Sequence, residues 1–390
     1  MGREVTAARA QDGASERARG GAAEPRLKVF ALASYPNEAA ATRYRVTQFT
    51  GPLAERGIDV TLSSFLGAGQ FLSLYEPGNL AGKAATLAAS SLRRLGDVAR
   101  ARRADVVFVQ REAMTLGPPV VEWLASRALR RPMVLDLDDA TYVPYVSPTY
   151  GRLGSAFKWF RKTDDLIRWS RVVTCGNRFI ADYVGSRGAR AVVIPTVVDT
   201  DAFRPRERPR ADDGVPVLGW IGTHSTYQYL ETIFPALQQL ARSHRFRLKV
   251  IGAGRETISL EGVEVENLKW SLPRETEDFR SFDVGLYPIR PDEWSAGKSG
   301  FKSVQYMAVG IPFVVTPFGA AAEIGREGET HLSASTTEEW HAALARLLAD
   351  AELRRRMGEA GRRHALEFYS VPAQADKLAA ALREAAATRG

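Results

Sequence analysis

Short apolar runs separated by longer amphipathic stretches recur along the chain from residue 27 onward. This alternation is typical of a parallel β-sheet with crossover helices, because strands that are buried on both faces read as continuous hydrophobic runs. In the first half of the chain the runs predict strands at Leu27–Ala33, Ile58–Ser63, Asp105–Val109, Met133–Leu137, Val172–Cys175 and Val192–Ile194. Helices are expected at Tyr44–Arg56, closed by Gly57, and around Leu80–Arg103.

A second alternating block follows residues 195–214, where prolines and a mixed-charge run interrupt the pattern. Its predicted strands are Val215–Ile221, Phe246–Ile251, Asp283–Tyr287 and Pro312–Thr316. Helices are expected at Thr226–Ser243, with a kink or break near Pro235, at Phe301–Val309 and from about residue 337 to 388. Two such blocks without a fixed-period repeat predict an α/β chain of two doubly wound Rossmann-like domains that face each other across a cleft.

The expected domain boundaries follow from this division. Residues 1–26 are rich in Ala, Gly, Arg and Glu, without a sustained apolar period, and are expected to be a disordered tail. The first domain spans 27–200 and is completed by the C-terminal helix at about 372–388. A linker at 201–213 leads to the second domain at 214–371.

Composition narrows the possible classes of protein. With 390 residues, 45% of them hydrophobic, the chain can build two cores. Cys175 is the only cysteine, which excludes an intramolecular disulfide and a cysteine-cluster metal site. No apolar run approaches the roughly 18 residues of a membrane span, and no secretory leader is evident, so a cytoplasmic location is expected.

The net charge of +8 favours a polyanionic partner, which could be nucleic acid, anionic lipid or a phosphorylated substrate. Nucleic acid is disfavoured because no helix-turn-helix, zinc or RNA-recognition motif is present. The arginines that cluster in one predicted helix are Arg93, Arg94, Arg100, Arg102 and Arg103. They either form a solvated face or, beside the apolar stretch Phe65–Leu74, permit peripheral contact with the inner face of a membrane.

The segment 283–324 carries the strongest candidate chemistry. Lys298 and Lys302 lie at, or just before, the start of a predicted helix, where as a like-charged i, i+4 pair they cost about 0.2 to 0.5 kcal/mol. An anionic ligand would offset that cost, and Ser299, Gly300 and the first helical amides could bind its phosphates. Gln305 lies on nearly the same helix side as Lys302. The alternative is that both lysines merely extend into water.

A second loop that could bind an anion follows the first strand of the second domain. Gly222, Thr223 and His224 precede Ser225 and Gln228, whose spacing fits a capping box at a helix start. Donor contact and simple turn hydrogen bonding are about equally expected for Thr223 and His224.

In the first domain, Asp136, Asp138 and Asp139 end a strand, with Asp136 and Asp138 on one face. Such carboxylates could hold a divalent metal or act as a general base, although the D-x-D pattern is a weak metal motif. We favour a substrate-facing loop role for Asp138 and Asp139. The alternative is helix capping or ion pairing with Arg111 or Arg131.

Two further arginines follow the first strand. Arg43 and Arg45 could bind phosphate, although as near neighbours on one helix they point in different directions.

At Gly219–Tyr229 and Asp283–Ile324 the chain resembles glycosyltransferase family 4 and its relatives of GT-B fold, and the resemblance extends loosely over 27–371. Supporting sequences are QRE at Gln110–Glu112, LDLDDA at Leu135–Ala140 and VIPTVVDTDAFRP at Val193–Pro205. The resemblance implies retaining transfer of a sugar from a nucleotide diphosphate donor.

The chain departs from the family pattern at the residues that bind the donor. Gln305 stands where a ribose-binding glutamate is expected, and Gly297 stands where a sugar-binding glutamate is expected. Thr223 and about Gln228 replace the arginine and lysine that hold the diphosphate, and Asp138 replaces a histidine. The resemblance therefore implies that Lys298 and Lys302 have taken over the contacts with the diphosphate.

The sequence thus predicts a metal-independent glycosyltransferase of the hexosyltransferase type in polysaccharide or glycoconjugate biosynthesis, with no cofactor besides its nucleotide-sugar co-substrate. The acceptor is a glycan, a lipid-linked compound or a small molecule. The expected catalytic residues are Asp138, Asp139 and Lys302, the donor-binding residues are Gly222, Thr223, His224, Lys298, Ser299, Gly300, Lys302 and Gln305, and the acceptor-binding residues are Arg43 and Arg45. The alternative is a catalytically silent nucleotide-binding module of the same fold.

Overall fold

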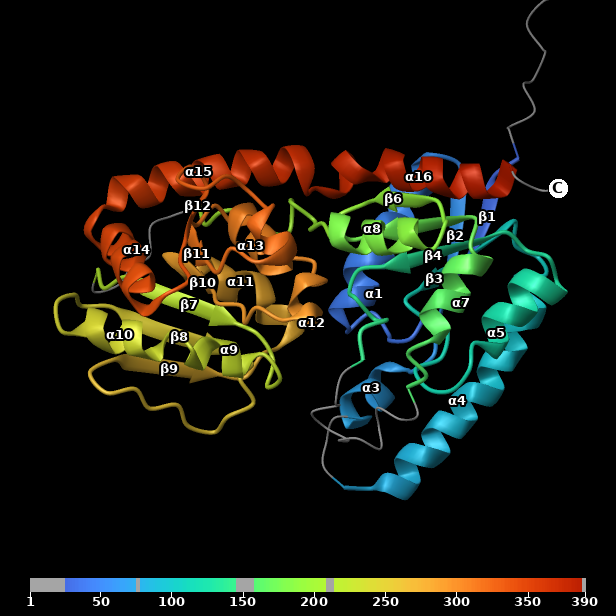
Figure 1. Cartoon of the computed structure of the whole chain (residues 1–390), viewed down its shortest axis with the longest axis horizontal. Helices are drawn as coiled ribbons and strands as arrows, with labels where there is room; N and C mark the ends of the chain where they lie inside the picture. The colour runs from blue at the N-terminus through green and yellow to red at the C-terminus, as the bar shows by residue number, and fades with distance from the viewer. Residues whose placement is uncertain (1–24, 75–77, 145–157, 208–213, 388–390) are drawn as a thin grey trace, which may run out of the picture.

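Two parallel β-sheets, each covered by helices, form two domains that lie side by side in the computed structural model (Figure 1). The structure describes residues 25–74, 78–144, 158–207 and 214–387. The predicted fold class, two Rossmann-like domains, is confirmed. The expected tail falls mostly on residues 1–24, outside the described residues, but Arg26 belongs to the first domain because its guanidinium contacts Asp59 at 2.7 Å.

The first sheet has six strands in the order β2-β1-β3-β4-β5-β6. The strands are β1 (Leu27–Ala33), β2 (Ile58–Ser64), β3 (Val106–Gln110), β4 (Met133–Leu137), β5 (Val172–Cys175) and β6 (Ala191–Val193). Its helices are α1 (Ala40–Arg45), η1 (Thr47–Phe49), α2 (Thr50–Glu55), α3 (Ala68–Leu74), α4 (Leu80–Ala101), α5 (Val120–Trp123), η2 (Leu124–Ala128), α7 (Lys162–Trp169) and α8 (Arg178–Ser186). The strand predictions agree with the structure to within one residue at each end, because both faces of this sheet are buried.

The second sheet also has six strands, in the order β12-β11-β10-β7-β8-β9. They are β7 (Val217–Ile221), β8 (Arg247–Ile251), β9 (Glu264–Leu268), β10 (Val284–Tyr287), β11 (Phe313–Val315) and β12 (His331–Ser333). The sequence pattern missed β9 and β12, which are the two edge strands. Most of β9 is only half-buried and β12 has three residues, so neither shows the apolar run by which the inner strands were recognised.

The helices of the second domain include one break that the sequence predicted. They are α9 (Tyr227–Glu231), α10 (Phe234–Ala241), η3 (Leu272–Arg274), α11 (Glu275–Arg280), α12 (Glu293–Ala296), α13 (Phe301–Ala308), η4 (Gly319–Ala322), α14 (Thr337–Ala349) and α15 (Ala351–Phe368). Pro235 falls in the first turn of α10, where its missing N–H costs nothing, so α9 and α10 are separate helices. The predicted capping box is wrong: α9 starts after Thr226, and Gln228 donates to the Ser225 carbonyl instead.

The last helix returns the chain to the first domain. Helix α15 runs along the second domain, and α16 (Val371–Ala387) continues across the first, as the top of Figure 1 shows. Leu378 and Leu382 of α16 are buried in one core of the first domain. Val198 pairs with Ser370 where the chain crosses back. The two domains are therefore joined by two chain segments rather than one, which restricts their relative motion.

A buried ion pair lies beneath the carboxyl end of the first sheet. Arg45 donates to Asp136 at 2.5 and 3.0 Å and to the Ile194 carbonyl at 2.7 Å, while the Thr174 hydroxyl donates to Asp136 at 2.6 Å. The side chains of Arg45 and Asp136 are each only 2% exposed. The structure therefore corrects one expectation, because Arg45 is not placed to meet an acceptor. Asp136, which the sequence offered only as a weak metal candidate, is taken up by the same ion pair.

We predict that Arg45→Met destabilises the protein by about 3 to 5 kcal/mol, because it leaves the Asp136 carboxylate buried without its partner. Chemical denaturation followed by circular dichroism measures the change. Arg26→Met, which removes the exposed ion pair with Asp59, serves as the control and should leave the unfolding midpoint unchanged. Equal midpoints for both variants would show that the buried pair contributes nothing.

Candidate active site between the two domains

The loop that precedes α13 is pressed against the first domain. A Cβ atom added at Gly297 would lie 2.2 Å from the Cβ atom of Ala140, so only glycine fits. The Asn177 side chain donates to the carbonyls of Gly297 and Lys298 at 3.1 and 3.3 Å. This contact joins the loops that follow β4, β5 and β10, which is where doubly wound domains bind ligands. A side chain at position 297 would collide with the first domain, which excludes the glutamate that the resemblance to family 4 leads one to expect there.

Two lysines of the second domain lie at this junction. Lys302, in the first turn of α13, places its ammonium 5.5 Å from the ring centre of Tyr287, and Lys298 lies 5.6 Å from the ring of Trp294. Burial, reinforced by the charge of Lys298 and opposed by Asp139, lowers the pKa of Lys302 to about 8. Among the described residues, none forms a hydrogen bond or ion pair with the Lys302 ammonium. The site therefore holds a partly desolvated cation against an aromatic ring, with no carboxylate bound to it.

The facing residues of the first domain are two carboxylates held by one arginine. Arg111 donates to both oxygens of Asp138 at 2.5 and 2.7 Å, and to one oxygen of Asp139 at 2.5 Å. Gln110 donates a further bond to Asp138 at 3.2 Å. The alternative of ion pairing with Arg111 is thus the arrangement observed, whereas Arg131 bonds to the Ala104 carbonyl.

The two carboxylates differ in their electrostatic state. Burial favours a higher pKa for Asp138, but the Arg111 guanidinium outweighs it and holds that pKa below its ordinary value. Burial raises the pKa of Asp139 despite the opposing attraction of Arg111. Asp139 also interacts electrostatically with Lys298 and Lys302 across the interface. It is therefore the carboxylate that the first domain presents to the lysines.

The sequence did not identify Arg111 as a site residue, although it lies in the QRE sequence after β3. Its backbone adopts a left-handed conformation with φ of 60°, which is unfavourable for a residue other than glycine. The Arg111 amide donates to the Asp136 carbonyl at 2.8 Å, which fixes this turn. Backbone strain of this kind clusters at active sites and ligand-binding sites.

The loop after β7 approaches the loop after β8 through a set of glycines. A Cβ atom at Gly252 would lie 2.4 Å from the Gly222 carbonyl oxygen, and one at Gly254 would lie 2.8 Å from the His224 Cβ atom. Thr223 and His224 are exposed at the end of this loop. Thr223 forms turn hydrogen bonds with Thr226, as the simpler alternative expected, and Tyr229 links α9 to α12 through a 3.4 Å contact with Ser295.

The remaining donor-side candidates lie on or just before α13. Gln305 is 5% exposed, and its side-chain amide has no hydrogen-bond partner among the described residues. Ser299 is half-buried in the loop. Gly300 has φ of 63°, and a Cβ atom there would lie 2.2 Å from the side chain of Ile324. Glycine is thus required at position 300 by packing as well as by backbone conformation.

Arg43, expected at the acceptor, instead connects the two domains. Its guanidinium lies 3.0 Å from Glu275 of α11, and the Tyr44 hydroxyl donates to the same carboxylate oxygen at 2.8 Å. Arg43 also donates to the carbonyls of Asn37 and Glu38. The guanidinium groups of Arg43 and Arg45 are therefore both bonded within the protein, and neither is placed to contact an acceptor.

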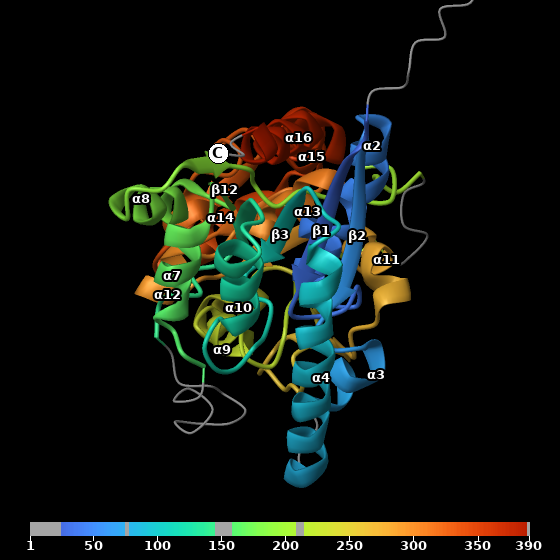
Figure 2. The same ribbon diagram turned by 90° about the vertical axis from the view of Figure 1, so that its right-hand side faces the viewer.

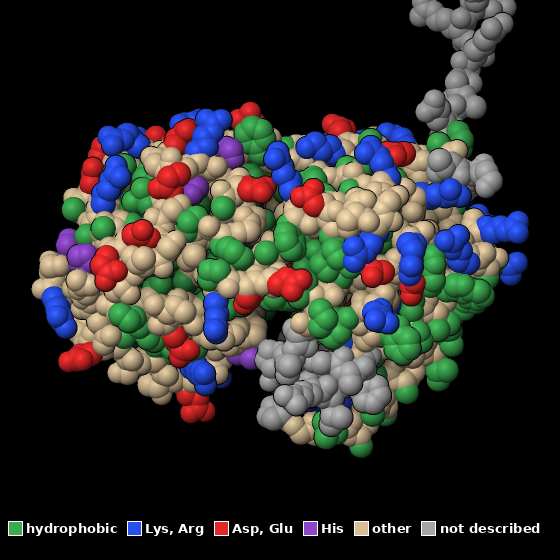
Figure 3. Space-filling model, in the orientation of Figure 1, with side chains coloured by type: hydrophobic (Ala, Val, Ile, Leu, Met, Phe, Trp, Pro, Cys, Tyr) green, Lys and Arg blue, Asp and Glu red, His purple; other side chains and the backbone are tan. Residues whose placement is uncertain are grey.

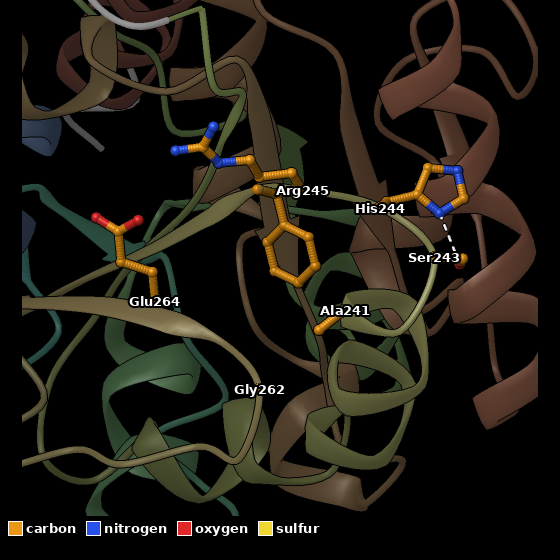
Figure 4. Close-up of a pocket in the computed structure, with 7 residues that line it drawn as sticks. Ala241, Ser243, His244, Arg245, Gly262 and Glu264 are labelled. Atoms are coloured by element: carbon orange, nitrogen blue, oxygen red, sulfur yellow. Dashed lines mark hydrogen bonds between the residues drawn. The ribbon is translucent and has the colours of Figure 1, made fainter.

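A pocket of about 370 Å³ lies elsewhere, at the amino ends of β8 and β9. Its lining residues include His244, Arg245 and Glu264, and the His244 ring contacts Ser243 at 2.9 Å (Figure 4). Ligands of parallel sheets bind beyond the carboxyl ends of the strands, so this pocket is at the wrong end of the sheet to serve the candidate site.

The described residues were expected to form neither a metal site nor a membrane span. In residues 25–74, 78–144, 158–207 and 214–387, no group of three or more His, Cys, Asp and Glu side chains is placed to bind a metal ion. No helix in the same ranges is both long enough and apolar enough to cross a bilayer.

Two facing Rossmann-like domains with a shared C-terminal crossing define the GT-B fold, the architecture of many glycosyltransferases. Residues 215–350 match the model of the family described as "Glycosyl transferases group 1". This match covers the second domain from β7 to the end of α14, which includes both lysines and the loop after β7.

Individual proteins show the same likeness. The D-inositol 3-phosphate glycosyltransferase of Corynebacterium jeikeium is 26% identical over 237 residues, covering 53% of this chain and 52% of that protein. The chain thus matches about half the length of this curated relative. A glycosyltransferase structure from Rickettsia africae superposes with a TM-score of 0.67 at 13% identity, covering 94% of this chain and 100% of that one. Anabaena HepE in complex with UDP-glucose superposes with a TM-score of 0.60 at 16% identity, covering 92% and 99%.

We predict that Lys302→Met raises the melting temperature by a few degrees at pH 7 and by less at pH 10. The pKa of Lys302 is about 8 in the folded protein against an ordinary 10.5, so its charge destabilises the fold fully below pH 8, and the penalty fades as the pH rises to 10.5. Differential scanning fluorimetry measures the shift, with the exposed Lys269→Met as the control. A melting-temperature difference from wild type that does not change with pH would contradict a desolvated Lys302.

Proposed function

We propose that this protein transfers a sugar from a nucleotide diphosphate donor to an acceptor hydroxyl, in the cleft where α13 meets the loop after β4. The observation that carries the proposal is the desolvated Lys302, which lies beside Lys298 at a helix start and forms no ion pair with any carboxylate in the described part of the chain. Two adjacent cations that face Asp139 but form no ion pair with a described carboxylate suit a diphosphate, whose charge grows as the bond to the sugar breaks. The match of residues 215–350 to a glycosyltransferase family supports the same assignment.

On the donor side, Lys298 and Lys302 contact the diphosphate, together with the amides around Ser299 and Gly300. The loop Gly222–His224 approaches the donor from the neighbouring strand end. The buried amide of Gln305 contacts the ribose, in place of the glutamate that the resemblance to family 4 leads one to expect. Anabaena HepE, which has the same fold, was crystallised with UDP-glucose, so nucleotide sugars with a hexose are the first donors to test.

On the acceptor side, Asp139 meets the reacting sugar or the acceptor hydroxyl. Arg111, which also binds Asp138, holds the Asp139 side chain in place. The bond from the anomeric carbon to the diphosphate oxygen breaks, and the diphosphate leaves with the electron pair. The acceptor oxygen then bonds to the same carbon on the face that the diphosphate left, which retains the configuration. The acceptor proton passes to a nearby base, for which Asp139, with its raised pKa, is suited.

The acceptor belongs to one of three chemical classes: a glycan, a lipid-linked compound or a small molecule. We place the reaction in the cytoplasm, where nucleotide sugars are available, within polysaccharide or glycoconjugate synthesis. The cations and helix amides supply the charge that a metal would supply at the leaving group, so we propose that no metal or organic cofactor takes part.

The alternative is a catalytically silent module that retains a nucleotide pocket, favoured by the absence of both signature glutamates at Gly297 and Gln305. A panel of nucleotide sugars separates the two functions when thermal shift and release of the free nucleotide are measured together. Stabilisation with turnover supports the transferase, and stabilisation without turnover on any acceptor supports the silent module. If no nucleotide sugar stabilises the protein, the proposed donor site is wrong.

We predict that Lys302→Ala lowers kcat/KM for the donor at least about tenfold, because one cation at a leaving group contributes about 1.4 kcal/mol or more. Lys298→Ala should have a smaller effect, because Lys302 remains at the helix start. Steady-state kinetics at limiting and saturating donor measure both variants. Lys269→Ala, an exposed lysine of the same domain, is the matched control. Full turnover by Lys302→Ala would contradict a role for that lysine at the leaving group.

We also predict that activity survives EDTA, since side-chain cations and backbone amides balance the leaving-group charge. The measurement is the initial rate before and after chelation and dialysis. Loss of activity that magnesium or manganese restores would instead give Asp139 a metal to hold.

A further inference from the structure

Helix α4 buries several polar side chains and exposes large apolar ones. The residues that it buries are Ser90, Arg94, Asp97 and Ala101. Arg94 contacts Asp97 at 2.9 Å and donates to the Ala33 carbonyl at 2.7 Å, and the Ser63 hydroxyl donates to Asp97 at 2.7 Å. Buried polar side chains therefore help to attach this helix to the first domain, together with the apolar contacts of Val98 and Ala101.

The face opposite this network is apolar and exposed. Its residues are spaced by four, three, four, three and four positions, which places them on one stripe of a helix. They are Ala81, Ala85, Ala88, Leu92, Leu95 and Ala99. Leu92 is 71% exposed and Leu95 is 45% exposed, while Leu80 at the start of the helix is 70% exposed. Figures 1 and 2 show the amino-terminal part of α4 extending beyond the body of the first domain.

The same apolar character continues on the neighbouring helix. Helix α5 packs beside α4, and its Val120 and Trp123 are 42% and 47% exposed. Hydrophobic side chains accordingly gather along the lower right edge of the molecule in Figure 3, where α4 and α5 lie in Figure 1. By contrast, Phe65 and Leu66 are buried, so these two residues of the apolar stretch Phe65–Leu74 do not contribute to this surface.

The exposed charges of α4, of α5 and of the segment that joins them have one sign. Between residues 78 and 131, all of which the structure describes, every exposed charged side chain is basic. These residues are Arg93, Arg100, Arg102, Arg103, Arg127 and Arg130. The acidic residues of this stretch face inward: Asp97, Glu112 and Glu122 are buried, and Asp105 accepts a hydrogen bond from the Lys28 amide.

We infer that the α4–α5 face docks on the surface of an anionic lipid bilayer. Exposed leucines and a tryptophan can enter the boundary between headgroups and acyl chains, while the arginines beside them meet lipid phosphates. A second copy of the chain fits less well, because pairing this face with itself would bring two sets of arginines together. Nucleic acid would satisfy the arginines but leaves the exposed leucines without a role. This inference does not depend on the proposed sugar transfer.

The test is sedimentation of the full chain with vesicles of phosphatidylcholine containing about 30% phosphatidylglycerol, compared with pure phosphatidylcholine. The wild-type protein should pellet with the anionic vesicles only. Leu92→Ser with Leu95→Ser should weaken partitioning by about tenfold, through lost apolar burial. Arg100→Gln with Arg103→Gln should weaken it by about fivefold for each arginine. These side chains are exposed, so the variants should keep the wild-type melting temperature.

Matched controls lie on the second domain. Leu366 and Phe368 of α15 are 45% and 39% exposed, and Leu366→Ser with Phe368→Ser removes comparable apolar surface from another face. The exposed Arg356 and Arg363 of the same helix give the charge control, as Arg356→Gln with Arg363→Gln. Equal vesicle binding by the α4 variants and these controls would overturn the inference. So would a dimer that Leu92→Ser disrupts, or retention of DNA without binding to vesicles. Vesicle binding without sugar transfer would leave the docking surface standing and remove the proposed function alone.

Discussion

The close approach of Gly297 to Ala140 is the contact on which the candidate site depends. It brings the loop before α13 against the end of β4, and Asn177 fixes it by donating to two carbonyls of that loop. Lys298 and Lys302 are thereby held opposite Asp139, although the lysines lie 159 and 163 residues after that aspartate in the sequence. A larger residue at 297 would separate the domains and remove the electrostatic coupling that makes the site distinctive.

The first domain prepares its side of the cleft by matching each acidic group with an arginine. Arg45 is paired with Asp136 deep under the sheet, and Arg111 holds Asp138 and Asp139 at the surface of the cleft. The buried pair has a structural role, because neither side chain reaches solvent. In the outer group, burial raises the pKa of Asp139, and the charge of this carboxylate interacts with that of Lys298. Of these three carboxylates, Asp136 is buried in an ion pair under the sheet, whereas Asp139 faces the lysines of the second domain.

At the candidate site the second domain does the reverse, since neither Lys298 nor Lys302 forms an ion pair with a carboxylate among the described residues. Lys302 lies over Tyr287, and burial lowers its pKa to about 8. A protein that needed only stability would gain by placing an acid beside this lysine or by removing the charge. Retaining an unpaired, partly buried cation is a cost that a diphosphate ligand would offset. Helix α4 follows a similar logic on another face, because its exposed apolar stripe lowers solubility unless something covers it.

The sequence by itself determined the two alternating blocks, the inner strands, the break at Pro235 and the position of both lysines at a helix start. These features depend on local periodicity and backbone chemistry, which are present in any short window of sequence. It did not reveal β9 and β12, whose short or half-exposed segments lack an apolar run. Nor did it reveal the partners of Arg43, Arg45 and Arg111, or which face of α4 is buried. The tertiary structure decided these, because an arginine becomes a structural ion pair, a link between domains or a site residue only through the carboxylate that the fold places beside it.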